Sequence, residues 1–196
     1  MNDERRTKND ERCDWPSGNQ LLIDYHDHEW GEPVHDDRKH FEFMVLDLFQ
    51  AGLSWLTIMK KRENFRAAFD NFRVEKVAKY DSRKIDSLLG DAGIIRNRMK
   101  IQATIHNAKE FIKVQDEFGS FDKYIWQFTG GSTIHNKWKE LKQLPVTTLE
   151  SDEMSKQLKK RGFKFVGSTI CYSYMQAAGM VNDHLIHCFR HEQLLK

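Results

Sequence analysis

The sequence predicts an all-α fold, and three observations support this. Apolar residues recur at the three- and four-residue spacing of amphipathic helices over much of the chain. Alternating apolar and polar residues, which would indicate strands, form few sustained runs. The three prolines fall where no helical pattern is running, at Pro16, Pro33 and Pro145.

The helical patterns follow one another along the chain. Their apolar positions lie within 41–49, 85–89, 101–112, 121–128, 154–158 and 168–178. Ser120 and Ser151 are expected to cap the helices that follow them. Gly179 is expected to end the helix that begins near Ser168. The segment 127–145, which contains Gly130-Gly131, is expected to be rich in loops.

The bulk properties favour one globular domain over 13–196, preceded by a flexible polar tail over 1–12. The 196 residues carry a net charge of only +2, which neither requires nor excludes a nucleic-acid partner. We find no apolar run of membrane-spanning length and no signal peptide, so we expect a cytoplasmic protein without a membrane partner. Three cysteines in such a chain argue against a disulfide framework.

Four metal-ligating residues lie near the two ends of the chain. Cys13 and His26 are close to one end, and His184 and Cys188 are close to the other. The last two are four residues apart, so we expect them on one face of a helix. Two thiolates and two imidazoles form a closed, structural zinc set. Spacing alone fits buried cysteines among scattered histidines equally well, and His191 is an alternative ligand.

A second group combines aromatic rings with a carboxylate. Trp15, Tyr25, Trp30 and Trp55 are flat rings on which a nucleobase could stack, although ordinary core packing explains them too. Asp47 interrupts an otherwise apolar helical segment. A carboxylate in that position needs either a structural partner or a function.

Two turns could contact DNA. Gln50-Ala51-Gly52-Leu53 should break the helix before Ser54 caps the next one, and Leu53 at its tip could enter a duplex. Around Gly90 and Gly93, a compact hairpin could offer backbone N–H groups to a phosphate. Basic residues follow this hairpin and recur later, at Arg96, Arg98, Lys100, Lys159, Lys160, Arg161 and Lys164. An ordinary helix corner and solvated charged faces are the alternatives.

Seven ordered motifs resemble one family, the DNA-3-methyladenine glycosylase I family of the helix-hairpin-helix superfamily. They span 11–15, 25–31, 50–55, 60–65, 91–96, 159–167 and 181–188. The resemblance covers the chain from Glu11 to about Cys188.

The resemblance implies a helix-hairpin-helix glycosylase fold in which a zinc lobe, 13–40 with 165–190, packs on the hairpin lobe. It implies a monomeric, monofunctional enzyme that flips and excises 3-methyladenine from alkylated double-stranded DNA. It places one structural zinc on Cys13, His26, His184 and Cys188. It places the base pocket at Trp15, Tyr25, Trp30 and Trp55, with a catalytic carboxylate at Asp47. DNA contacts fall at Gln50, Ala51, Gly52, Leu53, Gly93 and Arg96.

One position departs from the family pattern, which has Glu where this chain has Asp47. Because Asp is one methylene shorter, its carboxylate reaches less far toward a bound base. The alternative function is therefore a catalytically weak homologue that binds alkylated DNA. A zinc-dependent hydrolase is disfavoured, because four protein ligands leave the metal no open position.

Overall fold

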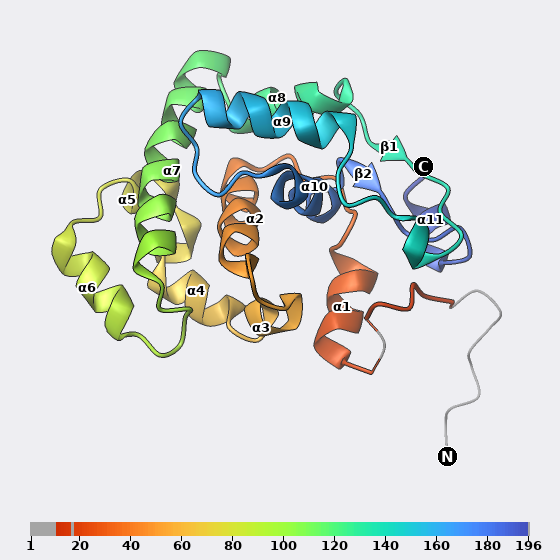
Figure 1. The fold of residues 1–196 in the computed structure, drawn as a ribbon, viewed down its shortest axis with the longest axis horizontal. Helices are drawn as coiled ribbons and strands as arrows, with labels where there is room; N and C mark the ends of the chain where they lie inside the picture. The colour runs from red at the N-terminus through yellow and green to blue at the C-terminus, as the bar shows by residue number, and fades with distance from the viewer. Residues whose placement is uncertain (1–10, 17, 196) are drawn as a thin grey trace.

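The helix α2 (Asp37–Gln50) is the centre of the fold. The computed structural model describes residues 11–16 and 18–195, and within them α2 contacts α7 (Arg98–Phe118) on one side and α10 (Ser168–Ala177) on the other. Figure 1 shows α2 between these two helices. Every residue of α2 from His40 to Phe49 is buried, which explains why its sequence is apolar on most sides.

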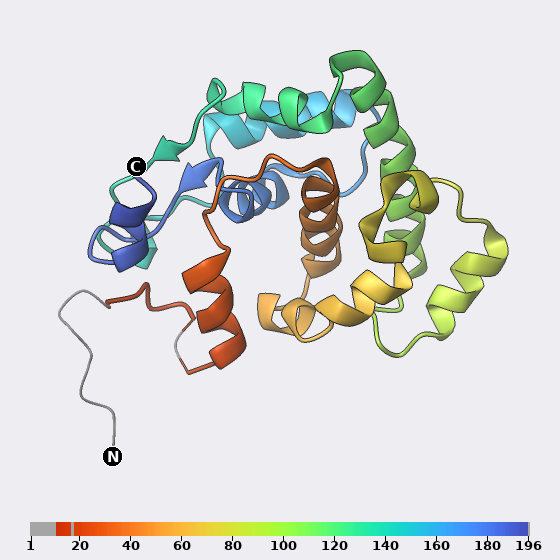
Figure 2. The ribbon, with the colours of Figure 1, turned by 180° about the vertical axis from the view of Figure 1, so that it is seen from behind.

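Short helices precede α7, and all but the first of them form one lobe with α7 (Figure 1). Their bounds are α1 Gln20–His28, α3 Trp55–Met59, α4 Arg62–Ala68, η1 Asp70–Phe72, α5 Val74–Val77 and α6 Ser82–Gly90. α6 and α7 are joined by the predicted hairpin, 91–97, and α6 is the outermost helix of this lobe in both ribbon views (Figures 1 and 2). Helix α6, the segment 91–97 and α7 lie where the sequence predicted the helix-hairpin-helix.

The rest of the chain covers the other end of α2. Its elements are α8 Phe121–Ile125, η2 Trp126–Thr129, β1 Ile134–His135, η3 Leu141–Gln143, α9 Leu149–Lys160, β2 Val181–Asn182 and α11 Phe189–Gln193. The fold is mostly helical, as predicted. It also contains one parallel strand pair of two residues each, β1 with β2, which is too short for sequence alternation to reveal.

The capping predictions were mostly correct. Ser120 caps α8 by accepting from the N–H of Lys123, and Gly179 follows the end of α10 with φ +68°. A Cβ on Gly179 would lie 2.3 Å from the backbone of Glu32, so only glycine fits there. The prediction for Ser151 was wrong. α9 begins three residues earlier, because Thr148 is its N-cap and Ser151 completes a reciprocal capping box.

The two ends of the chain are held together. The N–H of Phe189 donates to the carbonyl of Glu11 at 2.9 Å, and Arg12 pairs with Asp27 of α1 at 2.7 Å. The expected tail therefore does not extend to Arg12, and positions 1–10 lie outside the described residues. The expectation that His184 and Cys188 share a helix face was also wrong, because both precede α11.

A buried ion-pair network joins α4 to α2 and to the end of α1. Arg62 of α4 is 6% exposed and donates to Glu29, which follows α1, at 2.6 and 2.5 Å. It also donates to Glu42 of α2 at 2.7 Å. Burial opposes ionisation of Glu29, but the hydrogen bonds and charge of Arg62 prevail and lower its pKa to about 2. No helix among the described residues is long and apolar enough to cross a membrane.

Arg62→Met is expected to lower the free energy of unfolding by roughly 1.5–3 kcal/mol, because Glu29 and Glu42 lose their most buried partner and keep only Lys39 and Arg66. Urea titration followed by circular dichroism measures the change. Arg83→Met, at an exposed position of α6, is the matched control and should change stability by less than about 0.5 kcal/mol. Equal, small effects of the two substitutions would contradict the structural role of Arg62.

Candidate functional site

Four aromatic rings from separate elements form one continuous wall. Trp15 precedes α1, Tyr25 lies on α1, Trp30 follows α1, and Trp55 begins α3. Ring centroids are 5.2 Å apart for Trp15 and Trp30, 6.3 Å for Trp15 and Tyr25, and 5.4 Å for Tyr25 and Trp55. These edge-on and tilted contacts hold the rings rigidly. The structure therefore brings together all four residues that the sequence singled out.

This wall encloses a cavity of about 260 Å³. Its lining consists of Trp15, Tyr25, Trp30, Asp47, Gln50, Trp55, Leu141, Leu144, Ser173, Gln176 and Ala177. The volume lies just below the roughly 300–1,000 Å³ typical of sites for drug-sized ligands. A flat, mostly apolar molecule the size of one heterocyclic base is what such a cavity can hold.

Polar atoms without a partner face this cavity. Asp47 is 3% exposed, and its Oδ2 has no hydrogen-bond partner among the described residues; the same holds for Nε1 of Trp15 and of Trp55. Burial raises the pKa of Asp47 well above its usual value. The pKa of Tyr25 is also raised well above normal, first by burial and then by the charge of Asp47. Buried polar groups of this kind can accept a hydrogen-bond partner from a bound ligand or a water molecule.

The turn after α2 lies beside the cavity. Gly52 has φ +80°, a conformation that lets the chain reverse before Ser54 caps α3 by accepting from the N–H of Thr57. Leu53 at the tip is 40% exposed. A second cavity of about 190 Å³ adjoins the first and is lined by Asp47, Gln50, Ala51, Gly52, Leu53, Thr169, Ile170 and Ser173. The predicted wedge thus borders the same carboxylate as the base-sized cavity.

The four predicted metal-ligating residues also come together. The candidate ligand atoms of Cys13, His26, His184 and Cys188 all lie within 4.8 Å of one another, and all four residues are buried. Nδ1 of His184 is 3.2 Å from Nε2 of His26 and 3.6 Å from Sγ of Cys188. His191 is not among them, since its ring nitrogen bonds the carbonyl of Asn136. The cluster could hold a metal ion.

The outer nitrogens of both imidazoles are occupied. Nδ1 of His26 lies 2.7 Å from a carboxylate oxygen of Asp27, and Nε2 of His184 lies 2.9 Å from the carbonyl of Trp30. These contacts turn the remaining nitrogen of each ring toward the thiols. The hydrogen bond to Cys188, together with burial, raises the pKa of the Cys13 thiol. Both thiols can therefore ionise together only when a cation compensates their charge.

The cluster directly supports the aromatic wall. The His184 ring is 4.6 Å from Trp30, and the His26 ring is 5.5 Å from Trp15, centroid to centroid. Any shift of these imidazoles therefore moves two walls of the cavity.

The hairpin lies apart from the cavity and is tied internally. The N–H of Gly93 donates to Asp91 Oδ1 at 2.7 Å, and the carbonyls of Ala92 and Gly93 accept from Lys61. This N–H, one of those expected to hold a phosphate, is thus already bonded. Arg96 is exposed beside it.

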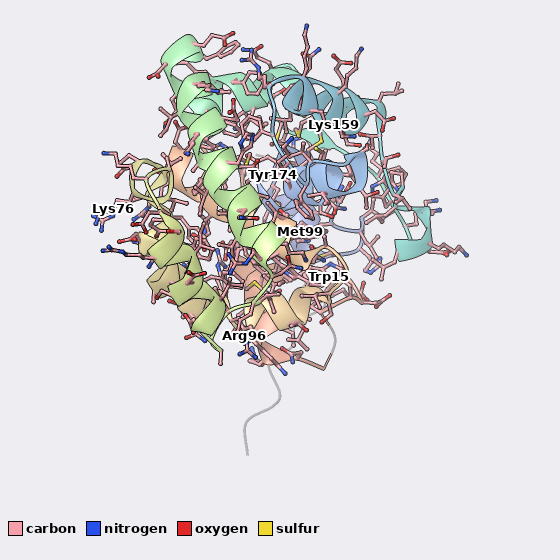
Figure 3. All side chains as sticks on the ribbon, turned by 60° about the vertical axis from the view of Figure 1, so that its left-hand side comes forward. Trp15, Lys76, Arg96, Met99, Lys159 and Tyr174 are labelled. Carbon is pink, nitrogen blue, oxygen red and sulfur yellow. The ribbon has the colours of Figure 1, made fainter. Side chains whose placement is uncertain are left out.

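The two basic runs lie in different parts of the molecule. Figure 3 shows Lys159 near one end of the molecule and Arg96 near the other. Lys100 was counted as part of a basic surface, and this was wrong: its side chain is buried and its ammonium group bonds two backbone carbonyls.

Sequence reasoning missed several lining residues. Ser173, Gln176 and Ala177 recur at helical spacing on α10, which was interpreted only as a core helix. Leu141 and Leu144 come from the loop-rich segment, where no periodicity could indicate which side chains point inward. The spacing of the α10 residues was the only available signal.

The site is thus a buried carboxylate inside an aromatic cavity of a mostly helical protein. Comparison with known proteins makes the class specific. The family model described as methyladenine glycosylase matches residues 15–191. The chain belongs to the methyladenine glycosylase family.

Curated and solved relatives agree with this assignment. DNA-3-methyladenine glycosylase 1 of Escherichia coli (strain K12) is 49% identical over 178 residues, which cover 91% of this chain and 95% of that protein. A crystal structure of 3-methyladenine DNA glycosylase I superposes with a TM-score of 0.89 at 49% identity, covering 91% and 98% of the two chains. The Staphylococcus aureus enzyme, solved for its recognition of 3-methyladenine, gives 0.88 at 34% identity, covering 90% and 94%.

The burial of Asp47 has a consequence for stability. Because its pKa is raised in the folded state, the folded protein holds this proton more tightly than the unfolded chain does. Stability is therefore lost as the pH rises from the unfolded pKa, near 3.9, toward the folded one. Asp47→Asn should raise the melting temperature at pH 8 and have little effect at pH 4. Asp116→Asn, at an exposed position of α7, is the control. A change in melting temperature for Asp47→Asn that is the same at pH 4 and pH 8 would contradict the raised pKa of Asp47.

Proposed function

We propose that this chain excises 3-methyladenine from alkylated double-stranded DNA by hydrolysing the N-glycosidic bond of a flipped nucleotide. The observation that carries the proposal is Asp47, a buried carboxylate with a partnerless oxygen inside an aromatic cavity of base size. An enzyme acting on a base in a duplex must take the base out of the stack and read its edge in such a pocket. The activity named for the relatives supports the same conclusion.

Recognition depends on charge. A base methylated at N3 is cationic while attached to the sugar, whereas normal adenine is neutral. In the cavity the carboxyl of Asp47 resists ionisation because it is desolvated. A cationic base lowers that resistance, so the ion pair forms with the lesion and not with adenine. Trp55 supplies a stacking surface, and Tyr25 and Asp47 hydrogen-bond the edge of the base.

Catalysis then needs little acid assistance, because the cationic base is already a good leaving group. Positioning supplies most of what remains: the rings hold the base, and water attacks the sugar carbon. Asp47 borders both the base-sized cavity and the adjoining one. It is thus placed to stabilise the positive charge that develops on the sugar or to orient the attacking water. Gln50 to Leu53 fill the space that the flipped nucleotide leaves.

The decisive experiment incubates the protein with methylated duplex DNA and identifies released bases by chromatography. We expect 3-methyladenine above the blank, and a loss of about 100-fold or more for Asp47→Asn, because the variant cannot form the ion pair with the cationic base or stabilise charge on the sugar. Asp47→Glu is expected to increase the rate, since the longer side chain reaches closer to the base. Asp116→Asn should act like the unmodified protein. Tight binding to an abasic duplex without any base release would instead support a catalytically weak homologue.

We also propose that Cys13, His26, His184 and Cys188 hold one structural zinc ion. In a tetrahedral site with zinc–ligand bonds of about 2.0–2.3 Å, neighbouring ligand atoms are roughly 3.3–3.8 Å apart. Four of the separations here, those of His184 from the other three ligand atoms and that of Cys188 from His26, are 3.2 to 3.8 Å, and all the ligand atoms lie within 4.8 Å of one another. Four protein ligands leave no position for substrate, so the ion stabilises the fold and takes no part in the reaction. We further propose that the protein acts on DNA as a monomer and in the cytoplasm.

Removal of the metal is expected to destabilise the protein before it affects chemistry. Elemental analysis should find one zinc per chain, and strong chelation or Cys188→Ser should lower the melting temperature markedly. Cys171→Ser is the matched control, because Cys171 is buried but lies outside the cluster. Full stability of a metal-free Cys188→Ser variant would show that the four residues are not a structural metal site.

A further inference from the structure

Two lysines connect the wedge turn 50–53 and the hairpin 91–93 in a reciprocal way. Lys100, on the helix that follows the hairpin, donates to the carbonyls of Phe49 and Ala51 at 2.9 and 2.6 Å. Lys61, shortly after the helix that follows the wedge turn, donates to the carbonyls of Ala92 and Gly93 at 2.8 and 3.2 Å. Each element is thus held by a lysine that belongs to the segment following the other element.

The bonds of Lys100 complete the end of α2. The last carbonyls of a helix have no partner within it, and a turn that leaves them unpaired would be free to move. Here the carbonyl of Gln50 accepts from the N–H of Leu53 at 2.6 Å, and Lys100 satisfies those of Phe49 and Ala51. The positive charge also opposes the negative end of the helix dipole. Three consecutive carbonyls below Leu53 are therefore fixed.

Burying the ammonium group of Lys100 costs desolvation energy, which its hydrogen bonds must offset. Its side chain is 6% exposed, and its hydrogen bonds within the described part of the chain go to uncharged carbonyls rather than to a carboxylate. Burial lowers its pKa accordingly. Contact with DNA phosphate is excluded for an ammonium group that is buried and already bonded. The hairpin end has equally little freedom, because a Cβ on Gly93 would lie 2.9 Å from Asp91 Oδ1 and 3.1 Å from Asn64.

We propose that Lys61 and Lys100 are positioning residues that lock the wedge turn to the hairpin as one rigid frame. The inference rests on the proposed function, in which Leu53 enters the gap left by the flipped nucleotide, and on the sequence expectation that the DNA backbone contacts the hairpin side, where Arg96 is exposed. Because the frame is rigid, attachment of the backbone at the hairpin sets how deeply Leu53 enters the duplex. Neither lysine contacts the base.

The test compares Lys100→Met, which keeps the apolar stem, with Lys109→Met, an exposed lysine on the same helix. Substrates are methylated double-stranded and methylated single-stranded DNA. A single strand leaves no gap in a duplex to fill, so a wedge defect should affect only the duplex. Lys100→Met is expected to slow release from the duplex by up to about 100-fold, the effect of a misplaced group, and from the single strand by less than about 3-fold. Lys100→Arg, which keeps the charge and the donors, should recover most of the duplex activity.

A double-substitution cycle with Leu53→Ala identifies the route of the effect. If Lys100 acts through the wedge, Leu53→Ala costs duplex activity in the original protein and almost none in the Lys100→Met background. Independent, additive losses would overturn the proposal. Equal losses on both DNA forms would overturn it too, because they indicate a general fault in folding or in the base pocket.

A readout without activity separates this inference from the proposed function. Lys100→Met should speed hydrogen exchange of the Leu53 amide, which bonds the Gln50 carbonyl, while Lys109→Met should not. Should Lys100→Met fail to fold, Lys61→Met gives the same test at the hairpin, because the contact of Lys61 with Ala92 is exposed. The quantity measured is then hydrogen exchange of the Gly93 amide, which bonds Asp91. Unchanged exchange in the folded variants would refute the frame even if the enzyme is fully active. Absence of base release from both DNA forms by the original protein would refute the proposed function alone.

Discussion

The architecture of the site depends on the contact between the two ends of the chain. Cys13 and His26 meet His184 and Cys188 in one buried cluster, although more than 150 residues separate the pairs along the sequence. The helix α1 is otherwise a short amphipathic element that would gain little stability alone. Because it carries Tyr25 and precedes Trp30, the joining of the ends is what sets two walls of the cavity. The carbonyl of Trp30 even serves as the outer partner of His184.

Two buried carboxylates, one structural and one in the cavity, differ in their hydrogen bonding. Asp183, 1% exposed, accepts from the side chains of Asn136, Trp138, Tyr172 and Gln176. Asp47, 3% exposed, keeps one oxygen without a partner in the described structure. The first arrangement satisfies both carboxylate oxygens with hydrogen-bond donors. The second leaves a desolvated oxygen that is free to bond a molecule in the cavity, and it gives up stability for that capacity.

Much of this organisation could be predicted from the sequence, for physical reasons that particular residues illustrate. The helix around Phe41 to Phe49 and the cap at Ser120 depend on local periodicity and local hydrogen bonds, which the sequence carries directly. The cluster and the aromatic wall required the resemblance to a family, because their members meet only through tertiary folding. Ser151 was misplaced because a serine at the third helical position of a capping box looks like a serine that caps.

The errors that matter most concern charge. A run of Arg and Lys after a glycine hairpin indicates a phosphate-binding surface, yet sequence pattern cannot tell whether an ammonium group faces solvent or caps another helix. Lys100 does the latter, because α7 begins next to the end of α2 and brings a long, flexible donor to its unpaired carbonyls. The hairpin, the wedge turn and the aromatic cavity are thus three local structures whose relative positions are set by a few buried polar contacts. In such a protein, specificity for a flipped base depends on those contacts as much as on the residues that touch it.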